Sequence, residues 1–265
     1  MNYFRKYGGP PFTVSVVHGG PGAAGEMAPV ARELSQDHGI LEPFQRADSV
    51  KGQILELKEI LLEAVGLPVI LVGYSWGAWL SLLFAAEYPE LVKKLILVSS
   101  GPFEARYADS IEETRYDRFT EEERIELNSL AGVLHDPAIE DKNKILKQFG
   151  ALISKADAYA AIKEEPENLE FRFDIYKSVW REAAELRRSG GLLKAAAQVR
   201  CPVTAIHGDH DPHPAAGVEE PLSRTLKDFQ FILLEKCGHK PWIEQEARDE
   251  FYKRLRQELK AATGL

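Results

Sequence analysis

The stretch VILVGYSWGAW, residues 69–79, places one serine between two glycines, after an aliphatic run and before a segment rich in alanine and leucine. The aliphatic run predicts a strand covered on both faces, and the apolar segment 76–90 predicts a buried helix. Strand, turn and helix are the context that the Gly-x-Ser-x-Gly elbow requires, because its glycines allow a very tight turn and its serine hydroxyl is exposed. Ser75 is therefore a candidate nucleophile, and an ordinary glycine-serine turn is the alternative.

The same alternation of strands and helices extends outward from this stretch. Aliphatic runs predict strands within 11–20, 93–101, 201–208 and 229–238, and 39–45 is a weaker candidate. Helices are expected over 23–37, after a cap at Asp48 or Ser49, near 218–226, and at the end of the chain in a segment carrying Trp242, Phe251, Leu255 and Leu259. This order predicts an α/β fold with a mostly parallel central sheet and helices on both faces.

The alternation stops in the middle of the chain. Between residues 103 and 195 every segment favours helix and none resembles a buried strand. We therefore predict a core formed by 1–102 and 196–265, with a helical cap, 103–195, inserted into it.

Composition excludes several classes of partner. The chain has 265 residues, of which 45% are hydrophobic and 28% charged, as in an ordinary globular protein. Its net charge of -8 argues against nucleic acid and against an anionic membrane surface. The start, MNYFRKYGGPPF, lacks the apolar core of a signal peptide, and no apolar run approaches the roughly 18 residues of a membrane span. We expect a cytoplasmic protein with a small-molecule substrate, and we leave its oligomeric state open.

The cysteines also suit a reducing compartment. Cys201 lies at the beginning of one predicted strand and Cys237 near the end of another, so a disulfide between them is not expected. Cys237 lies two residues before His239 but has no elbow, which favours a packed thiol over a thiol nucleophile.

A serine nucleophile needs a base and an orienting carboxylate, and the chain supplies both after predicted strands. AIHGDHDPHP, 205–214, presents Asp211, with Asp209 as a rival, and LEKCGHKPW, 234–242, presents His239. Because the carboxyl ends of parallel strands share one edge of a sheet, these side chains can meet Ser75. The order Ser, Asp, His is also the one that a fold with such an elbow uses.

These motifs resemble those of α/β-hydrolases: GYSWG stands where that family has its elbow, HGDHD its acid loop and GHKPWIE its histidine loop. The resemblance covers about residues 13–101 and 200–260. It implies a serine hydrolase with the triad Ser75, Asp211 and His239, an acyl-enzyme intermediate and no cofactor. It selects Asp211 over Asp209, and it implies an oxyanion hole formed by the backbone N–H groups of Gly20 and Trp76.

HGGPG at 18–22, SWG at 75–77 and QR before Ser49 are similar to proline iminopeptidases within that family. Ala47-Asp48 departs from the glycine-rich spacing of those peptidases. They recognise a free amino group through acidic cap residues, and the candidates here are Glu112, Glu113, Glu164, Glu165 and Glu167. A hydrolase of a small ester, lactone, amide or carbon-carbon bond substrate is nevertheless the main expectation, and a proline iminopeptidase-like aminopeptidase is the alternative. The alternative from another class is a silent member of the fold that only binds a ligand.

Two further groups of residues need an interpretation. Tyr74 and Trp180 are candidates for substrate contact, with Tyr159, Phe171 and Phe173 as possible walls of the cap. Histidines and aspartates crowd the acid loop, where zinc ligands are the alternative to packed or exposed side chains; these are His207, Asp209, His210, Asp211 and His213. Their spacing is unlike that of known zinc motifs, so we predict no metal.

Overall fold

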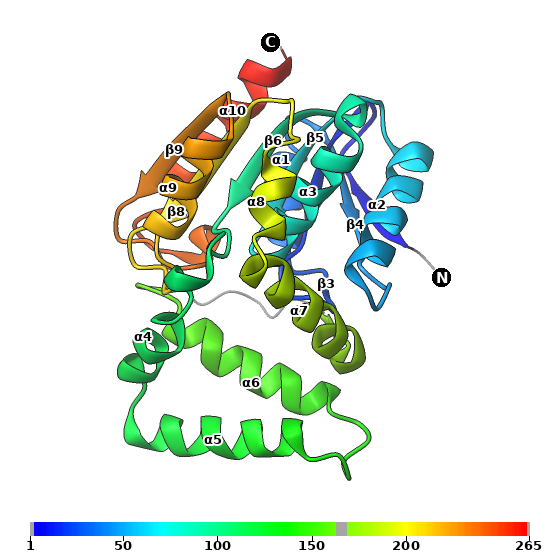
Figure 1. Ribbon diagram of the computed structural model, residues 1–265. Helices are drawn as coiled ribbons and strands as arrows, with labels where there is room; N and C mark the ends of the chain where they lie inside the picture. Colours follow the sequence, from blue (N-terminus) through cyan, green and yellow to red (C-terminus); the bar gives the residue numbers. More distant parts are fainter. Residues whose placement is uncertain (1–2, 163–168, 264–265) are drawn as a thin grey trace.

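A computed structural model describes residues 3–162 and 169–263 and contains a seven-stranded sheet in the order β1-β4-β2-β5-β6-β8-β9 (Figure 1). The strands are β1 (Phe4–Tyr7), β2 (Phe12–Val17), β4 (Gly39–Pro43), β5 (Val69–Tyr74), β6 (Val92–Val98), β8 (Val203–Gly208) and β9 (Phe229–Leu234). All neighbouring strands are parallel except β1 and β4. The predicted α/β fold with a mostly parallel sheet is confirmed, and β4 confirms the weaker candidate at 39–45.

Helices cover both faces of this sheet. One face packs against α1 (Ala28–Leu34) and α10 (Arg248–Thr263). The other packs against α2 (Val50–Ala64), α3 (Trp76–Glu87), α8 (Gly191–Ala196) and α9 (Ala216–Thr225).

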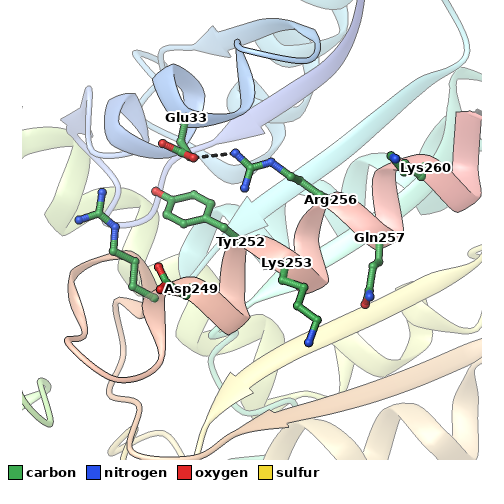
Figure 2. A pocket seen from close by; sticks show the side chains of 8 residues that line it. Glu33, Asp249, Tyr252, Lys253, Arg256, Gln257 and Lys260 are labelled. Atoms are coloured by element: carbon green, nitrogen blue, oxygen red, sulfur yellow. Dashed lines mark hydrogen bonds and ion pairs between the residues drawn. The ribbon is translucent and has the colours of Figure 1, made fainter.

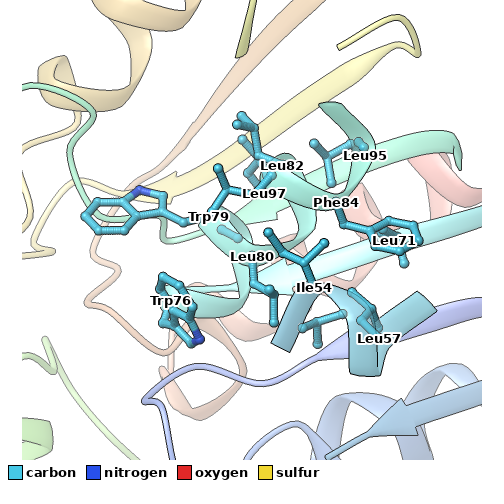
Figure 3. Packing of buried hydrophobic residues seen from close by; sticks show 14 of the residues in the cluster. Ile54, Leu57, Leu71, Trp76, Trp79, Leu80, Leu82, Phe84, Leu95 and Leu97 are labelled. Carbon is cyan, nitrogen blue, oxygen red and sulfur yellow. The ribbon is translucent and has the colours of Figure 1, made fainter. Parts of the chain in front are cut away.

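The alternation of side chains along each strand produces two separate cores. In β5, Leu71 joins the core beneath α3, whereas Ile70 and Val72 join the core beneath α10. Figure 3 shows the first of these cores, to which Trp76, Trp79 and Leu80 of α3 and leucines of the sheet, such as Leu71 and Leu97, belong. Because both faces are buried, the strand that precedes the elbow is held rigidly, and so is the turn that follows it.

Between β6 and β8 the chain forms mostly helices. The longer ones are α4 (Ile111–Arg118), α5 (Glu121–His135), α6 (Asn143–Ala156) and α7 (Phe173–Arg188). Figure 1 shows α4, α5 and α6 together at the end of the molecule opposite to the C-terminus. Within the described ranges, no helix combines the length and apolar character needed to cross a bilayer.

Three local features differ from the sequence-based expectations. The helix expected over 23–37 begins only at Ala28, because Ala23–Ala24 forms a short strand, β3. This strand pairs with β7 (Glu170–Phe171) of the mostly helical segment between β6 and β8, here called the insertion. Trp242 does not lie on the final helix: it belongs to a short 3-10 turn, Pro241–Ile243, where its ring packs edge-on against Tyr74 at 4.6 Å. The strand β1 was not predicted.

Candidate active site

Ser75 occupies a strained turn between β5 and α3. Its backbone has φ 52° and ψ −117°, a conformation that costs a non-glycine residue energy and is held by the two packed cores. A β-carbon on Gly73 would lie 2.3 Å from the Gly77 carbonyl oxygen, and one on Gly77 would lie 2.2 Å from the Val17 carbonyl oxygen. The pattern Gly-x-Ser-x-Gly is therefore required by contact between neighbouring backbones, and it turns Ser75 toward the loops that follow β8 and β9.

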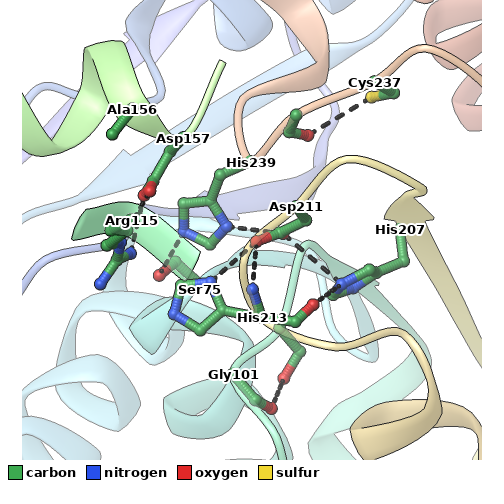
Figure 4. A network of polar contacts seen from close by, with 12 residues as sticks. Ser75, Gly101, Arg115, Ala156, Asp157, His207, Asp211, His213, Cys237 and His239 are labelled. Atoms are coloured by element: carbon green, nitrogen blue, oxygen red, sulfur yellow. Dashed lines mark hydrogen bonds and ion pairs between the residues drawn. The ribbon is translucent and has the colours of Figure 1, made fainter. Parts of the chain in front are cut away.

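The side chains of Ser75, His239 and Asp211 form a continuous chain of hydrogen bonds (Figure 4). His239 Nε2 lies 3.1 Å from Ser75 Oγ, and His239 Nδ1 lies 2.7 Å from Asp211 Oδ2. Because a carboxylate only accepts hydrogen bonds, Nδ1 carries the proton and Nε2 presents its lone pair to the serine hydroxyl. This arrangement can draw a proton from Ser75.

Asp211 is buried among imidazoles that keep it ionised. Burial by itself raises the pKa of Asp211, but His239, His213 and His207, together with the hydrogen bond from His213, hold that pKa well below its usual range. Asp211 Oδ1 accepts the backbone N–H of His213 at 2.9 Å. The rival Asp209 is directed elsewhere, because its Oδ1 accepts the backbone N–H of Cys237 at 3.1 Å.

The histidine-rich acid loop forms a hydrogen-bonded network. The side chains of Asp211, His213 and His239 are close enough to hold a metal ion. However, the Nδ1 atoms of His213 and His239 lie 2.8 and 2.7 Å from the two Asp211 oxygens, in the geometry of hydrogen bonds. His207 Nε2 donates to the His213 carbonyl at 2.8 Å, and His210 packs against Tyr159. These contacts therefore fit an aspartate that orients two histidine rings through hydrogen bonds, in preference to a metal site.

The backbone donors predicted for an oxyanion hole lie in two neighbouring segments, the start of α3 and the loop after β2. Trp76 is the first residue of α3, and the first amides of a helix have no partner within the helix. Gly20 follows β2, which pairs with β5 through Val17 and Gly73. The loop after β2 approaches the first turn of α3 so closely that a β-carbon on Gly77 would lie 2.4 Å from the His18 carbonyl oxygen. The roles of Gly20 and Trp76 stay predictions.

The aromatic candidates lie at different places. Tyr74 is 2% exposed and its ring contacts that of His239 at 5.1 Å, so it packs beside the imidazole. Trp180 of α7 stacks on Trp79, with ring centroids 6.1 Å apart. The indole of Trp76 donates to Gln53 at 2.9 Å within the core, so only its backbone is available to an anion at the elbow. Substrate contact by Tyr74 and Trp180 stays a prediction.

The other proposed walls are spread over the insertion. Tyr159 is exposed, Phe171 lies on β7, and Phe173 at the start of α7 stacks on Tyr176. Of the acidic candidates for amine recognition, Glu112 and Glu113 are exposed on α4. Glu164, Glu165 and Glu167 lie outside the described residues.

Sequence reasoning missed the contacts that hold the histidine loop against the insertion. The Asp157 carbonyl, at the end of α6, accepts the backbone N–H of His239 at 2.9 Å. The Asp157 carboxylate receives two hydrogen bonds from Arg115 of α4, at 2.6 and 2.7 Å. The buried Glu244 carboxylate accepts N–H groups from both sides of this junction. The spacing of residues in the sequence does not predict such contacts, although Glu244 is the last residue of the motif GHKPWIE.

Two surface pockets lie away from these residues. One, of about 660 Å³, follows α10 and is lined largely by charged side chains, including Arg256 paired with Glu33 at 2.6 Å (Figure 2). The other, of about 630 Å³, lies between α2 and α7 and includes Ile54 and Leu186. Neither is lined by Ser75, Asp211 or His239, so neither bears on the hydrogen-bonded chain at the elbow.

Comparison with known proteins gives a consistent result. The sequence profile of the alpha/beta hydrolase family matches residues 16–254. A pimeloyl-[acyl-carrier protein] methyl ester esterase of Nitrosospira multiformis is 26% identical over 209 residues, which cover 76% of this chain and 72% of the relative. Lipase 1 of Psychrobacter immobilis is 26% identical over 261 residues, covering 93% and 77%. The crystal structure of VinJ has a TM-score of 0.69 at 16% identity, covering 98% of this chain and 94% of that one, so it supports the fold alone.

Proposed function

The chain belongs to the alpha/beta hydrolase family, and on that premise we propose that it is a serine esterase whose triad is Ser75, His239 and Asp211. The observation that carries the proposal is the unbroken path from Ser75 Oγ to His239 Nε2 and from His239 Nδ1 to Asp211 Oδ2. It supplies the three roles of an acyl-transfer site in one connected arrangement. The substrate is a small molecule.

In the proposed mechanism, Ser75 Oγ attacks the carbonyl carbon of an ester while His239 Nε2 takes its proton. The carbonyl π electrons move to oxygen, and the N–H groups of Gly20 and Trp76 stabilise that charge. Collapse of this intermediate breaks the bond to the alcohol, which leaves with the proton from His239. Water then attacks the acyl-enzyme with the same imidazole as base, which releases the acid and restores Ser75. The chain provides every group in this sequence, and no step needs a cofactor.

Esters are the proposed substrate class because the two relatives described above are named methyl ester esterase and lipase. The aminopeptidase alternative needs a carboxylate free to bind an amino group. Among the described residues of 103–195, Asp157 is the one buried acid, and Arg115 occupies both of its oxygens. The described part of the chain thus favours the esterase.

The segment 103–195 is the proposed cap that covers the elbow and selects the substrate. Contacts between this segment and the histidine loop, above all Asp157 with His239, support that role. The cysteines Cys201 and Cys237 are both free, which suits the cytoplasmic location that we propose.

The test is labelling with a fluorophosphonate, followed by hydrolysis of nitrophenyl esters of graded chain length and of a prolyl arylamide. We expect Ser75→Ala to abolish labelling and to lower kcat by roughly 10⁴-fold or more. Ser223→Ala, on the exposed side of α9, is the matched control and should behave as wild type. Labelling that survives in Ser75→Ala would remove Ser75 from its role, and a folded wild type without ester turnover or burst would favour a silent binder.

A further inference from the structure

Asp211 is hydrogen-bonded to a second imidazole, that of His213, besides that of His239. His213 Nδ1 lies 2.8 Å from Asp211 Oδ1, and His239 Nδ1 lies 2.7 Å from Asp211 Oδ2, so each carboxylate oxygen has its own ring (Figure 4). The two rings stack, with centroids 4.4 Å apart and planes inclined by 28°. The side chains of His213 and Asp211 are 10% and 0% exposed, so water does not compete freely for these contacts.

The protonation of His213 follows from this geometry. The ionised carboxylate can only accept, so His213 carries its proton on Nδ1. Burial lowers the pKa of His213 to about 4, against the opposing effect of Asp211, so the ring is neutral at neutral pH. A charged ring stacked on His239 would oppose the imidazolium that forms there during catalysis, and neutrality removes that conflict.

The main chain of His213 is also fixed. Its N–H donates to Asp211 Oδ1 at 2.9 Å, and its carbonyl accepts from His207 Nε2 at 2.8 Å. The backbone of His213 is therefore fixed on both sides of its side chain. Because the ring contacts both Asp211 and His239, its position can determine theirs.

We propose that His213 is a positioning residue: its Nδ1–H turns Asp211 Oδ2 toward His239, its ring supports the face of the His239 imidazole, and its share of the carboxylate's charge sets the acid limit of activity. The inference rests on the proposed function. It assigns His213 no contact with substrate.

The sign of the pH effect follows from the shared carboxylate. The Nδ1–H of His213 offsets part of the Asp211 charge that would otherwise stabilise a protonated His239. Without this donor, protonated His239 is favoured, and activity is lost at a higher pH on the acid side. Other groups face these two rings: His207 from β8, Tyr74 from β5, and Arg115 and Asp157 from the insertion. None of them is changed in the test.

Two substitutions separate the hydrogen bond from the stack. His213→Phe keeps a ring but has no donor, and His213→Asn keeps an amide N–H near the position of Nδ1 but has no ring. We expect the acid limb of the kcat/KM profile to move up by about one pH unit in His213→Phe and to stay within a few tenths of a unit in His213→Asn. In both we expect kcat to fall by roughly tenfold, with KM little changed. His210→Asn is the control, because His210 lies outside this network.

A shift of the acid limb in His213→Phe but not in His213→Asn would exclude a purely structural role. A structural role would lower the amount of folded enzyme without moving the pH profile. Profiles identical to wild type in both variants would overturn the proposal. Imidazole ¹⁵N NMR gives a second answer without any substitution at 213: the Nδ1–H form of neutral His213 is expected at pH 7. The Nε2–H form or a charged ring would also overturn the proposal. The same spectrum can be recorded on Ser75→Ala, so failure of the proposed function remains a separate result.

Discussion

Glu244 is expected to hold the histidine loop to the helical insertion, and Glu244→Gln tests this directly. Its side chain is fully buried, and its two oxygens accept three backbone N–H groups. Oε1 accepts from Gly238 and Tyr159, both at 2.9 Å, and Oε2 accepts from Ala160 at 2.7 Å. Gly238 precedes His239, whereas Tyr159 and Ala160 belong to the insertion. One carboxylate therefore joins both sides.

The cost of the substitution can be worked from these three bonds. Glutamine has the same shape, but one of its terminal groups is an NH₂ that cannot accept from an amide. Turned one way, the new side chain loses the bond from Ala160, and turned the other way it loses two. The favoured orientation loses one bond to a charged group, so the free energy of unfolding falls by about 1.5–3 kcal/mol. For a chain of this length that is a fall in Tm of roughly 3–6 °C.

The assay is thermal and urea unfolding, followed by ester turnover. We expect kcat to fall by up to about 10²-fold, because the loop that carries His239 is less well held. Glu246→Gln is the matched control: its carboxylate pairs with Lys236 at 2.5 Å on the surface, where both side chains are 52% exposed, so little change is expected. If Glu244→Gln unfolds at the same temperature as this control, the carboxylate does not hold the junction.

Three further predictions concern the elbow, the base and the thiols. Gly77→Ala places a β-carbon 2.2 Å from the Val17 carbonyl oxygen, so we expect no folded soluble protein, and a normal yield would contradict the packing argument. An imidazole base must be neutral to accept a proton, so kcat/KM should decline toward acid pH, and a profile flat down to pH 4 would exclude His239. Burial raises the pKa of Cys201 to about 11 and also raises that of Cys237, so iodoacetamide at pH 8 should leave ester turnover intact. Rapid inactivation would show a reactive thiol.

The elements predicted well from sequence are those whose burial leaves a pattern. The run that forms β5 is fully buried, so it is continuously apolar, and the glycines at 73 and 77 mark a contact between backbones. By contrast, β1 reads FRKY and lies at an exposed edge, where charged residues blunt the strand and leave no apolar signal. The two-residue strands β3 and β7 are too short to show any period.

The candidate site divides in the same way. Ser75, Asp211 and His239 each follow a strand of the parallel sheet, so topology alone indicates that they can meet. Asp209 and Asp211 are the same residue type in the same loop, so residue type does not distinguish them. The conformation of the loop directs Asp209 toward the N–H of Cys237. His213 could not be singled out, because its significance depends on a ring stack that spacing does not encode.

The pairing of β3 with β7 joins the loop at 18–22 to the insertion, so we expect the two segments to move together. The Gly22 carbonyl accepts the N–H of Arg172 at 2.8 Å, directly beside the pairing of Ala23 with Phe171. Replacing the proposed cap by that of a relative would also replace β7, the strand that pairs next to the loop containing Gly20. We therefore expect such an exchange to change turnover together with substrate range.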